Sequence, residues 1–223
     1  MINKTQNLKL LNKRISELKL KGKVIIAFDF DELVIPIHLT REITKKYPKP
    51  INKIKLEKLG SCSFRGIEYL NSLAVGYNFK EYEKIRNKIS KKTKWSKGFK
   101  ELLRKLAKKY SLIFITSGMK DICESKLKEI RFNSKNIIGG EFAIKNNKIL
   151  GSKLIISDKD KGVIIQKLKK RGYFVVSVGH SLGDKFMLEK SDLSISFNSK
   201  MQNLAQFNTK SPEEIYNIIE TQI

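Results

Sequence analysis

Apolar and polar residues follow two different periods along this chain. Short continuous runs of β-branched and aromatic residues predict buried strands, over residues 24–30, 110–118, 173–179 and 192–197. Apolar residues that recur every three or four positions predict helices, over residues 7–20, 98–109, 120–130 and 160–172. Because strands alternate with helices, the pattern favours an α/β fold with a parallel sheet covered by helices on both faces.

Turn and cap residues add detail in three places. Two strand-like runs flank the pair Asn146-Asn147, which indicates a β-hairpin. Gly172 is placed to end the helix before it. The segment "SPEE" predicts that a last helix starts with Ser211 as its cap, and that Glu214 completes a capping box.

The segment from residue 36 to residue 96 has a different pattern from the rest of the chain. It contains short helical patterns and many lysines, and no run typical of a buried strand. We therefore expect a helical insert, or cap, over residues 36–96. Residues 1–35 and 97–223 would then form one α/β core.

Polar residues gather where the predicted strands end. Asp29 and Asp31 follow the first strand, Ser117 and Gly118 close the second, and the segment 180–184 follows the third. In a parallel sheet the ligand crevice lies beyond the carboxyl ends of the strands. Segments that are distant in the sequence are thus expected to meet in one crevice.

Two carboxylates two residues apart suit phosphoryl transfer. Asp29 could attack phosphorus and form an aspartyl-phosphate. Asp31 could protonate the leaving alcohol and later activate water. A divalent cation would let these carboxylates approach a phosphate dianion.

Further residues complete this hypothesis. The Ser117 hydroxyl and the Gly118 N–H suit a phosphate oxygen at the start of a helix. Lys161 is placed to balance the charge of nucleophile and phosphate, with Lys153 and Lys159 as nearby alternatives. A second acidic group after the third strand, Asp184, would complete a metal site.

Four segments resemble the motifs of haloacid dehalogenase superfamily phosphatases, and most closely those of the phosphoserine phosphatase group. They are "FDFDELV", "LIFITSG", "KGVIIQKL", and "VGHSLGDKFML" followed by "SDLSISFNSK". The resemblance runs from about residue 23 to the C-terminus. It implies a Rossmann-like three-layer core with a small helical cap after the first strand. It also implies Mg²⁺, or another divalent metal such as Mn²⁺, held by Asp29, Asp31 and Asp184.

The chain departs from the family pattern at several positions. His180 stands where the family usually has a metal-binding Asp, and imidazole suits softer metals than magnesium. His180 is therefore either a ligand or a non-ligand histidine. His38 occupies the place of a Glu that contacts the substrate amine, and Leu33 stands where Thr or Val is usual. Arg65 could replace the missing cap arginine or could be a surface residue. We expect a substrate other than phosphoserine, with extra negative charge.

Composition bounds the partners of the chain. With 46 Lys and Arg against 22 Asp and Glu, the formal net charge is +24, which attracts anions. The lysines are spread along the whole chain, and no zinc-finger or RGG pattern occurs, so a nucleic-acid partner is a minor alternative.

No apolar run is long enough to span a membrane, and the N-terminus lacks a signal-peptide pattern. The two cysteines, Cys62 and Cys123, are far apart in the sequence, which favours reduced thiols and a cytoplasmic protein. We expect the protein to be a monomer or a homodimer.

The sequence therefore leads to one main hypothesis and two alternatives. The main hypothesis is a metal-dependent phosphomonoester hydrolase acting on a small phosphorylated substrate. The first alternative is a phosphate-binding module in which His180 has removed hydrolysis. The second is a nucleic-acid-associated end phosphatase, whose binding would weaken steeply with salt.

Overall fold

A single mixed sheet forms the centre of the computed structural model, which describes residues 2–47, 49–199 and 203–223. Lys200, at the end of the fourth similar segment, lies outside the described residues. The strands are β1 (Val24–Phe28), β2 (Ser111–Met119), β3 (Ile137–Lys145), β4 (Lys148–Leu154), β5 (Phe174–Gly179), β6 (Leu193–Phe197) and β7 (Phe207–Thr209). Their order across the sheet is β4-β3-β2-β1-β5-β6-β7. Neighbouring strands are parallel except β3 and β4, so the predicted α/β fold is confirmed.

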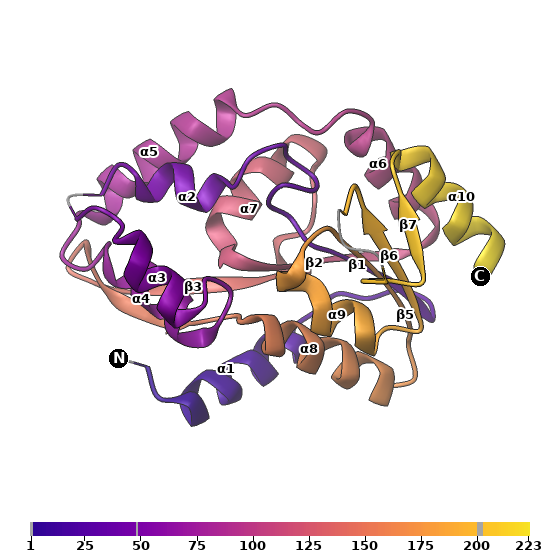
Figure 1. Cartoon of the computed structure of the whole chain (residues 1–223), viewed down its shortest axis with the longest axis horizontal. Helices are drawn as coiled ribbons and strands as arrows, with labels where there is room; N and C mark the ends of the chain where they lie inside the picture. The colour runs from indigo at the N-terminus through magenta and orange to yellow at the C-terminus, as the bar shows by residue number, and fades with distance from the viewer. Residues whose placement is uncertain (1, 48, 200–202) are drawn as a thin grey trace.

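Helices cover both faces of this sheet (Figure 1). They are α1 (Lys4–Ser16), α2 (Leu39–Thr44), α3 (Lys53–Leu59), α4 (Phe64–Ser72), α5 (Phe79–Lys92), α6 (Phe99–Lys109), α7 (Lys120–Leu127), α8 (Asp158–Lys170), α9 (Lys185–Lys190) and α10 (Pro212–Gln222). The side chains of β1 alternate between the two faces of the sheet, so this strand packs against a helical layer on each face. Ile26 and Phe28 pack with apolar residues of α6, α7 and α10, whereas Ile25 and Ala27 pack with those of α1, α8 and α9.

The predicted hairpin is confirmed as β3 and β4, which pair antiparallel. Asn146 and Asn147 form its two-residue turn, both with positive φ (49° and 58°), a backbone conformation that asparagine tolerates and that suits a tight hairpin. This hairpin also contacts the segment that follows α4. The Gly76 N–H donates to the Ile149 carbonyl, and the Ile149 N–H donates to the Tyr77 carbonyl.

The helix-end predictions have mixed outcomes. Gly172 follows α8 with a φ of 82°, as expected of a glycine that ends a helix. The Ser211 hydroxyl caps α10 by accepting the Glu214 N–H. The predicted capping box is wrong, because the Glu214 carboxylate accepts the N–H of Lys210 and not that of Ser211.

Helices α2 to α5 lie between β1 and α6 in the sequence, in the segment predicted as a cap. The division into a core of residues 1–35 and 97–223 and a cap of residues 36–96 stays a prediction. None of the described helices combines the length and the apolar character needed to cross a membrane.

Candidate active site

The carboxyl ends of β1, β2 and β5 bring the predicted polar residues to one edge of the sheet. Asp29 comes directly after β1, and its N–H donates to the Val178 carbonyl of β5 at 3.0 Å. Ser117 and Gly118 lie near the end of β2, and His180 follows β5 directly. The parallel register of these neighbouring strands therefore places three distant segments at one rim.

Lys161 joins two carboxylates at this rim. Its Nζ lies 2.7 Å from Asp29 Oδ1 and 2.7 Å from Asp184 Oδ1, and all three side chains are buried. Burial alone would lower the pKa of Lys161, but the charges of Asp184 and Asp29 outweigh it and raise the pKa above its usual value. Lys161 lies near the start of α8, and a capping box between Ser157 and Asp160 fixes that helix start. The fixed helix start holds Lys161 at the rim.

Asp184 is the most strongly held acid of the group. Besides Lys161, its carboxylate accepts the backbone N–H groups of His180 (3.0 Å) and Ser181 (3.2 Å). Burial opposes ionisation, but the neighbouring charges of Lys161 and His180 lower the pKa of Asp184 below its usual value. Asp184 is therefore a carboxylate at neutral pH.

Asp31 is tied to the start of α2. Its Oδ1 accepts the Leu39 N–H at 2.9 Å, and its Oδ2 lies 3.5 Å from the Thr40 hydroxyl. Burial and the neighbouring charge of Asp29 raise the pKa of Asp31 to about 7. His38 Nδ1 also lies 3.5 Å from Asp31, but burial and the charge of Arg41 lower the pKa of His38 to about 4. His38 is therefore a neutral imidazole at neutral pH, not an ion-pair partner.

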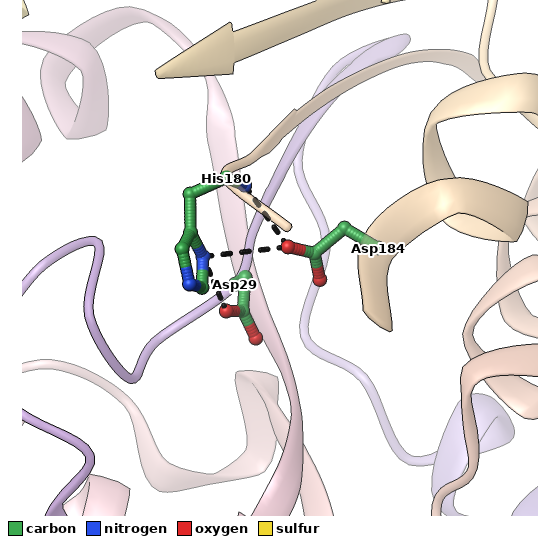
Figure 2. A group of neighbouring side chains, drawn as sticks. All are labelled: Asp29, His180 and Asp184. Carbon is green, nitrogen blue, oxygen red and sulfur yellow. Dashed lines mark hydrogen bonds and ion pairs between the residues drawn. The ribbon is translucent and has the colours of Figure 1, made fainter. Parts of the chain in front are cut away.

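His180 points its ring between two carboxylates (Figure 2). Its Nδ1 lies 3.3 Å from Asp29 Oδ2 and 3.5 Å from Asp184 Oδ2, yet the atom is buried without a hydrogen bond of acceptable geometry. Burial would lower the pKa of His180, but Asp184 and Asp29 raise it to about 10. Donor atoms of Asp29, His180 and Asp184 lie within 4.8 Å of one another, which is a spacing that suits a metal ion.

The end of β2 supplies hydroxyl and backbone donors. The Ser117 Oγ is buried and has no hydrogen-bond partner. The Gly118 N–H donates to the Thr116 hydroxyl at 2.9 Å, so its predicted bond to a phosphate would require an exchange of partners. Gly118 also has a steric role, because a Cβ there would meet the Thr40 hydroxyl at 2.4 Å.

Most of these residues line one pocket of about 240 Å³, whereas the fully buried Asp184 lies outside its lining. Its lining is Asp29, Asp31, Glu32, His38, Arg41, Ser61, Cys62, Thr116, Ser117, Gly118, Lys161, His180, Ser181, Leu182 and Gly183. A larger cleft of about 1020 Å³ lies beside α6 and α10 and shares only Glu32 with this pocket. It lacks the paired aspartates, so the smaller pocket is the candidate active site.

Comparisons with known proteins show what this chain is similar to. No family model matches the chain. The chain is 27% identical over 190 residues to a phosphoserine phosphatase of Archaeoglobus fulgidus, covering 81% of this chain and 54% of that relative. It is 25% identical over 194 residues to a phosphoserine phosphatase of Methanocaldococcus jannaschii, covering 81% of this chain and 88% of that relative. The chain thus spans about half the length of the first relative and most of the second.

Solved structures show the same fold. A substrate-bound phosphoserine phosphatase superposes with a TM-score of 0.71 at 20% identity, covering 90% of this chain and 99% of that one. A haloacid dehalogenase family hydrolase from Salmonella enterica serovar Typhi superposes with a TM-score of 0.67 at 15% identity, covering 85% and 68%. In sequence this chain is similar to phosphoserine phosphatases, and in fold it is similar to phosphoserine phosphatases and to a haloacid dehalogenase family hydrolase.

The structure also shows which residues reach the pocket. Arg65 is exposed on α4 and is absent from the lining. Arg41, on α2, is in the lining, although sequence reasoning did not select it. Ser61 and Cys62 were missed as well, because nothing in their local pattern marks them as neighbours of Asp29.

Proposed function

We propose that this chain is a phosphomonoester hydrolase that acts through an aspartyl-phosphate on a small phosphorylated substrate. One observation carries the proposal: Asp29 lies paired with Lys161 in a pocket that also holds the partnerless Ser117 hydroxyl. Partnerless buried polar atoms are rare in proteins, and a hydroxyl facing a pocket is available to a ligand. The similarity to phosphoserine phosphatases supports the same reaction class.

In the proposed first step, an Asp29 carboxylate oxygen attacks phosphorus and the ester P–O bond breaks. Asp31 gives a proton to the leaving alcohol oxygen. In the second step, Asp31 takes a proton from water as the water oxygen attacks the same phosphorus. The bond from phosphorus to Asp29 breaks, and inorganic phosphate and the Asp29 carboxylate are restored.

Lys161 and Ser117 have positioning roles in this scheme. Lys161 fixes the Asp29 carboxylate through Oδ1, at 2.7 Å, and leaves Oδ2 on the side of His180. The Ser117 hydroxyl donates to a phosphoryl oxygen. The Gly118 N–H also donates to a phosphoryl oxygen once its hydrogen bond to the Thr116 hydroxyl has broken. The Lys161 charge also offsets part of the charge that develops on the phosphoryl group.

The residues present fit a divalent cation. Asp29, Asp184 and His180 would hold it, because their donor atoms lie within 4.8 Å of one another and His180 Nδ1 has no hydrogen bond. His180 would bind as the neutral imidazole, so the cation would replace the proton that Asp29 and Asp184 favour on its ring. Magnesium prefers oxygen donors, whereas an imidazole nitrogen suits borderline ions, so this set favours manganese or a similar ion over magnesium. A bound cation supplies compensation for the combined negative charge of Asp29 and the phosphate.

We further propose that the substrate is not phosphoserine and that it carries extra negative charge. A neutral imidazole, His38, stands where an amine-binding carboxylate is expected. A site whose polar groups do not match a substrate group discriminates strongly against that substrate. A pocket of about 240 Å³ suits a small molecule, since pockets for drug-sized ligands run from about 300 Å³ upwards.

A second candidate is a phosphate-binding module without hydrolysis. The observation that favours it is the approach of His180 Nδ1 to 3.3 Å from Asp29 Oδ2, because that contact occupies the proposed nucleophile. This candidate expects ligand-induced thermal stabilisation by inorganic phosphate with no product formed. It also expects hydrolysis to appear in the His180→Asp variant.

Turnover of 4-nitrophenyl phosphate tests the main proposal, with magnesium, manganese, nickel and zinc supplied in parallel. We expect turnover with at least one of these ions, and loss of that turnover in Asp29→Asn. Asp158→Asn is the matched control, because Asp158 lies in the first turn of α8 but outside the pocket lining. Absence of turnover with every ion, or full activity in Asp29→Asn, would contradict the proposal.

A further inference from the structure

We propose that this chain has a second binding site, for a nucleoside polyphosphate, at the sheet edge opposite the candidate active site. The site is a pocket of about 480 Å³, which we call the amino-edge pocket. Its lining includes Ser111 at the start of β2 and Asn136 just before β3, so it lies at the amino ends of the strands. Ser111 stands six residues before Ser117 along β2, which is about 20 Å of extended strand. This inference does not depend on the proposed function.

Positive charge is unopposed in the amino-edge pocket. Among the described residues its lining holds four cationic side chains and no acidic one; the four are Lys19, Lys21, Arg104 and Arg131. All four residues are exposed, and none of their side chains forms an ion pair or a hydrogen bond with another described residue. Glu220 reaches the lining residue Tyr110, but its carboxylate is already bound by the Tyr110 hydroxyl and by Lys109. Because the four cations repel one another, a ligand with several negative charges is the one that they favour.

Two buried polar side chains hold the segment that carries Lys19 and Lys21. The Asn136 side chain accepts the Lys19 N–H at 2.8 Å and donates to the Lys19 carbonyl at 2.9 Å. The Ser111 hydroxyl accepts the Lys21 N–H at 2.5 Å and donates to the Lys21 carbonyl at 2.8 Å. The backbone at both lysines is thus fixed beside the pocket before a ligand binds. A site that is fixed in advance loses less conformational entropy on binding.

Arg131 has a backbone conformation that few side chains adopt. It follows the short 3-10 helix Lys128–Ile130 with a φ of 55°, in the left-handed region where glycine and asparagine are the usual residues. No contact of its guanidinium with another described residue explains why an arginine stands here. Strained backbone conformations are concentrated at functional sites, and a contact between Arg131 and a ligand would account for this one.

The pocket also offers apolar surface that a purely anionic ligand would not use. Tyr110 and Phe132, both half-buried, line it together with Leu103, Ala107 and Ile130. Nucleobases stack on aromatic rings and on guanidinium groups, whereas arginine and lysine bind phosphate. The volume of about 480 Å³ lies within the range of small-molecule pockets. A single nucleotide with several adjacent phosphates uses both features, whereas a nucleic-acid strand would need a continuous basic groove.

Calorimetric titration of ATP into the wild-type protein tests this inference. The titration is done in EDTA, which prevents any metal-dependent turnover. Adenosine and inorganic tripolyphosphate are titrated in parallel, because each is one part of ATP. We expect one ATP to bind per chain, more tightly than tripolyphosphate by about tenfold or more, since the base adds stacking. Adenosine should bind most weakly, and added salt should weaken the binding of ATP.

Three variants locate the binding. Arg104→Gln and Arg131→Gly should each weaken the binding of ATP by about 3- to 10-fold, the range for one exposed hydrogen bond. Arg131→Gly should also keep or raise the melting temperature, because glycine adopts a φ of 55° without strain, so lost binding would not mean lost folding. Ser117→Ala changes the candidate active site and should leave the affinity for ATP unchanged. Arg65→Gln is the matched control for charge, since Arg65 is exposed on α4 and lies outside the lining of the amino-edge pocket.

Four results would overturn the inference. The first is tripolyphosphate binding as tightly as ATP, and the second is an equal loss of ATP affinity in Arg65→Gln. The third is a loss in Ser117→Ala with none in Arg104→Gln and Arg131→Gly, which would place ATP in the candidate active site. The fourth is a single-stranded oligothymidylate that binds more tightly than ATP and is weakened by the same two variants, which would assign the pocket to nucleic acid. No arm measures hydrolysis, so failure of the proposed function would leave this test intact.

Discussion

Two lysines are buried almost completely in the described part of the chain, and their surroundings differ. Lys126 on α7 is 2% exposed, and its Nζ donates to the Thr93 carbonyl and to Glu129, each at 2.6 Å. It also lies 5.4 Å from the centre of the Trp95 ring. Lys161 on α8 is 3% exposed and lies between two buried carboxylates.

The difference between the two sites lies in what surrounds each ammonium. Glu129, the acid that pairs with Lys126, has a side chain that is 38% exposed, so this cluster joins the protein surface. Around Lys161, the Ser117 hydroxyl and His180 Nδ1 have no hydrogen-bond partner. They are two of the three such buried side-chain atoms in the described residues; the third belongs to Glu68. A buried charge alone does not mark a functional site, whereas a buried charge beside partnerless polar atoms in a pocket does.

The largest expected effect separates the two lysines by activity. Lys161→Met should lower kcat/KM for 4-nitrophenyl phosphate by about 100- to 1000-fold, the range for removing one preorganised charge-stabilising group. Lys126→Met should keep kcat/KM within about threefold, because Lys126 lies outside the pocket lining. Steady-state kinetics on folded protein, verified by circular dichroism, measures both. Equal losses in the two variants would remove the functional distinction.

A smaller effect is expected at His180 and tests the metal preference. His180→Asp replaces the imidazole nitrogen by a carboxylate oxygen beside Asp29 and Asp184. The ratio of magnesium-supported to manganese-supported turnover should then rise by about tenfold or more, because magnesium prefers oxygen ligands. The measurement is a titration of each metal against initial rate. The same ratio in both proteins would mean that His180 is not a ligand.

The stability of the two lysine sites gives the next comparison. Lys126→Met should lower the free energy of unfolding by about 1–3 kcal/mol, because the Thr93 carbonyl loses its donor in a buried position. Lys161→Met should cost more, about 3–5 kcal/mol, because two buried carboxylates lose their cation. Urea denaturation at neutral pH measures both values. A greater loss at Lys126 would contradict the burial argument.

The smallest expected effect concerns an ion pair outside both sites. Arg14 binds Glu141 through two bonds, at 2.6 Å and 2.8 Å. Burial favours the neutral acid, but Arg14 outweighs it and holds the pKa of Glu141 below its usual 4.5. A lowered folded-state pKa adds stability above pH 4.5, and this stability is lost as the pH falls through the folded-state pKa.

Glu141→Gln should therefore destabilise the protein by about 1 kcal/mol at pH 7, a value reduced by solvent screening. The difference from wild type should shrink as the pH falls below 4.5. Thermal melting across this pH range measures it. A difference that stays constant down to strongly acidic pH would show that the charge of Glu141 is not involved.

The sequence predicts the sheet and the rim of the site well, because both depend on local patterns. Continuous apolar runs mark β1, β2 and β5, and the polar residues just beyond them, such as Asp29, fall at the carboxyl ends of parallel strands. Lys161 was predicted because it opens a predicted helix and stands in a segment that resembles the family's lysine helix, with Lys153 and Lys159 as alternatives. The three-residue strand β7 was missed, because so short a segment has no measurable period.

Contacts between segments that are far apart in the sequence could not be predicted from local sequence patterns. Arg41 is a charged residue on a six-residue helix, and nothing in that pattern indicates that the helix start is held by Asp31. The burial of Lys126 was also missed, since it depends on the loop carbonyl of Thr93, which reaches it from another element. The Glu214 carboxylate accepts the N–H of Lys210 and not the N–H of Ser211 that a capping box would use.

The proposed covalent intermediate on Asp29 is the central claim of this account. The most direct test is acid quenching of a reaction with a radiolabelled phosphate ester during turnover, followed by peptide mapping of the protein. We predict label on the peptide that contains Asp29, sensitive to hydroxylamine and absent in Asp29→Asn. Release of phosphate without labelled protein, or label on a different residue, would contradict the account.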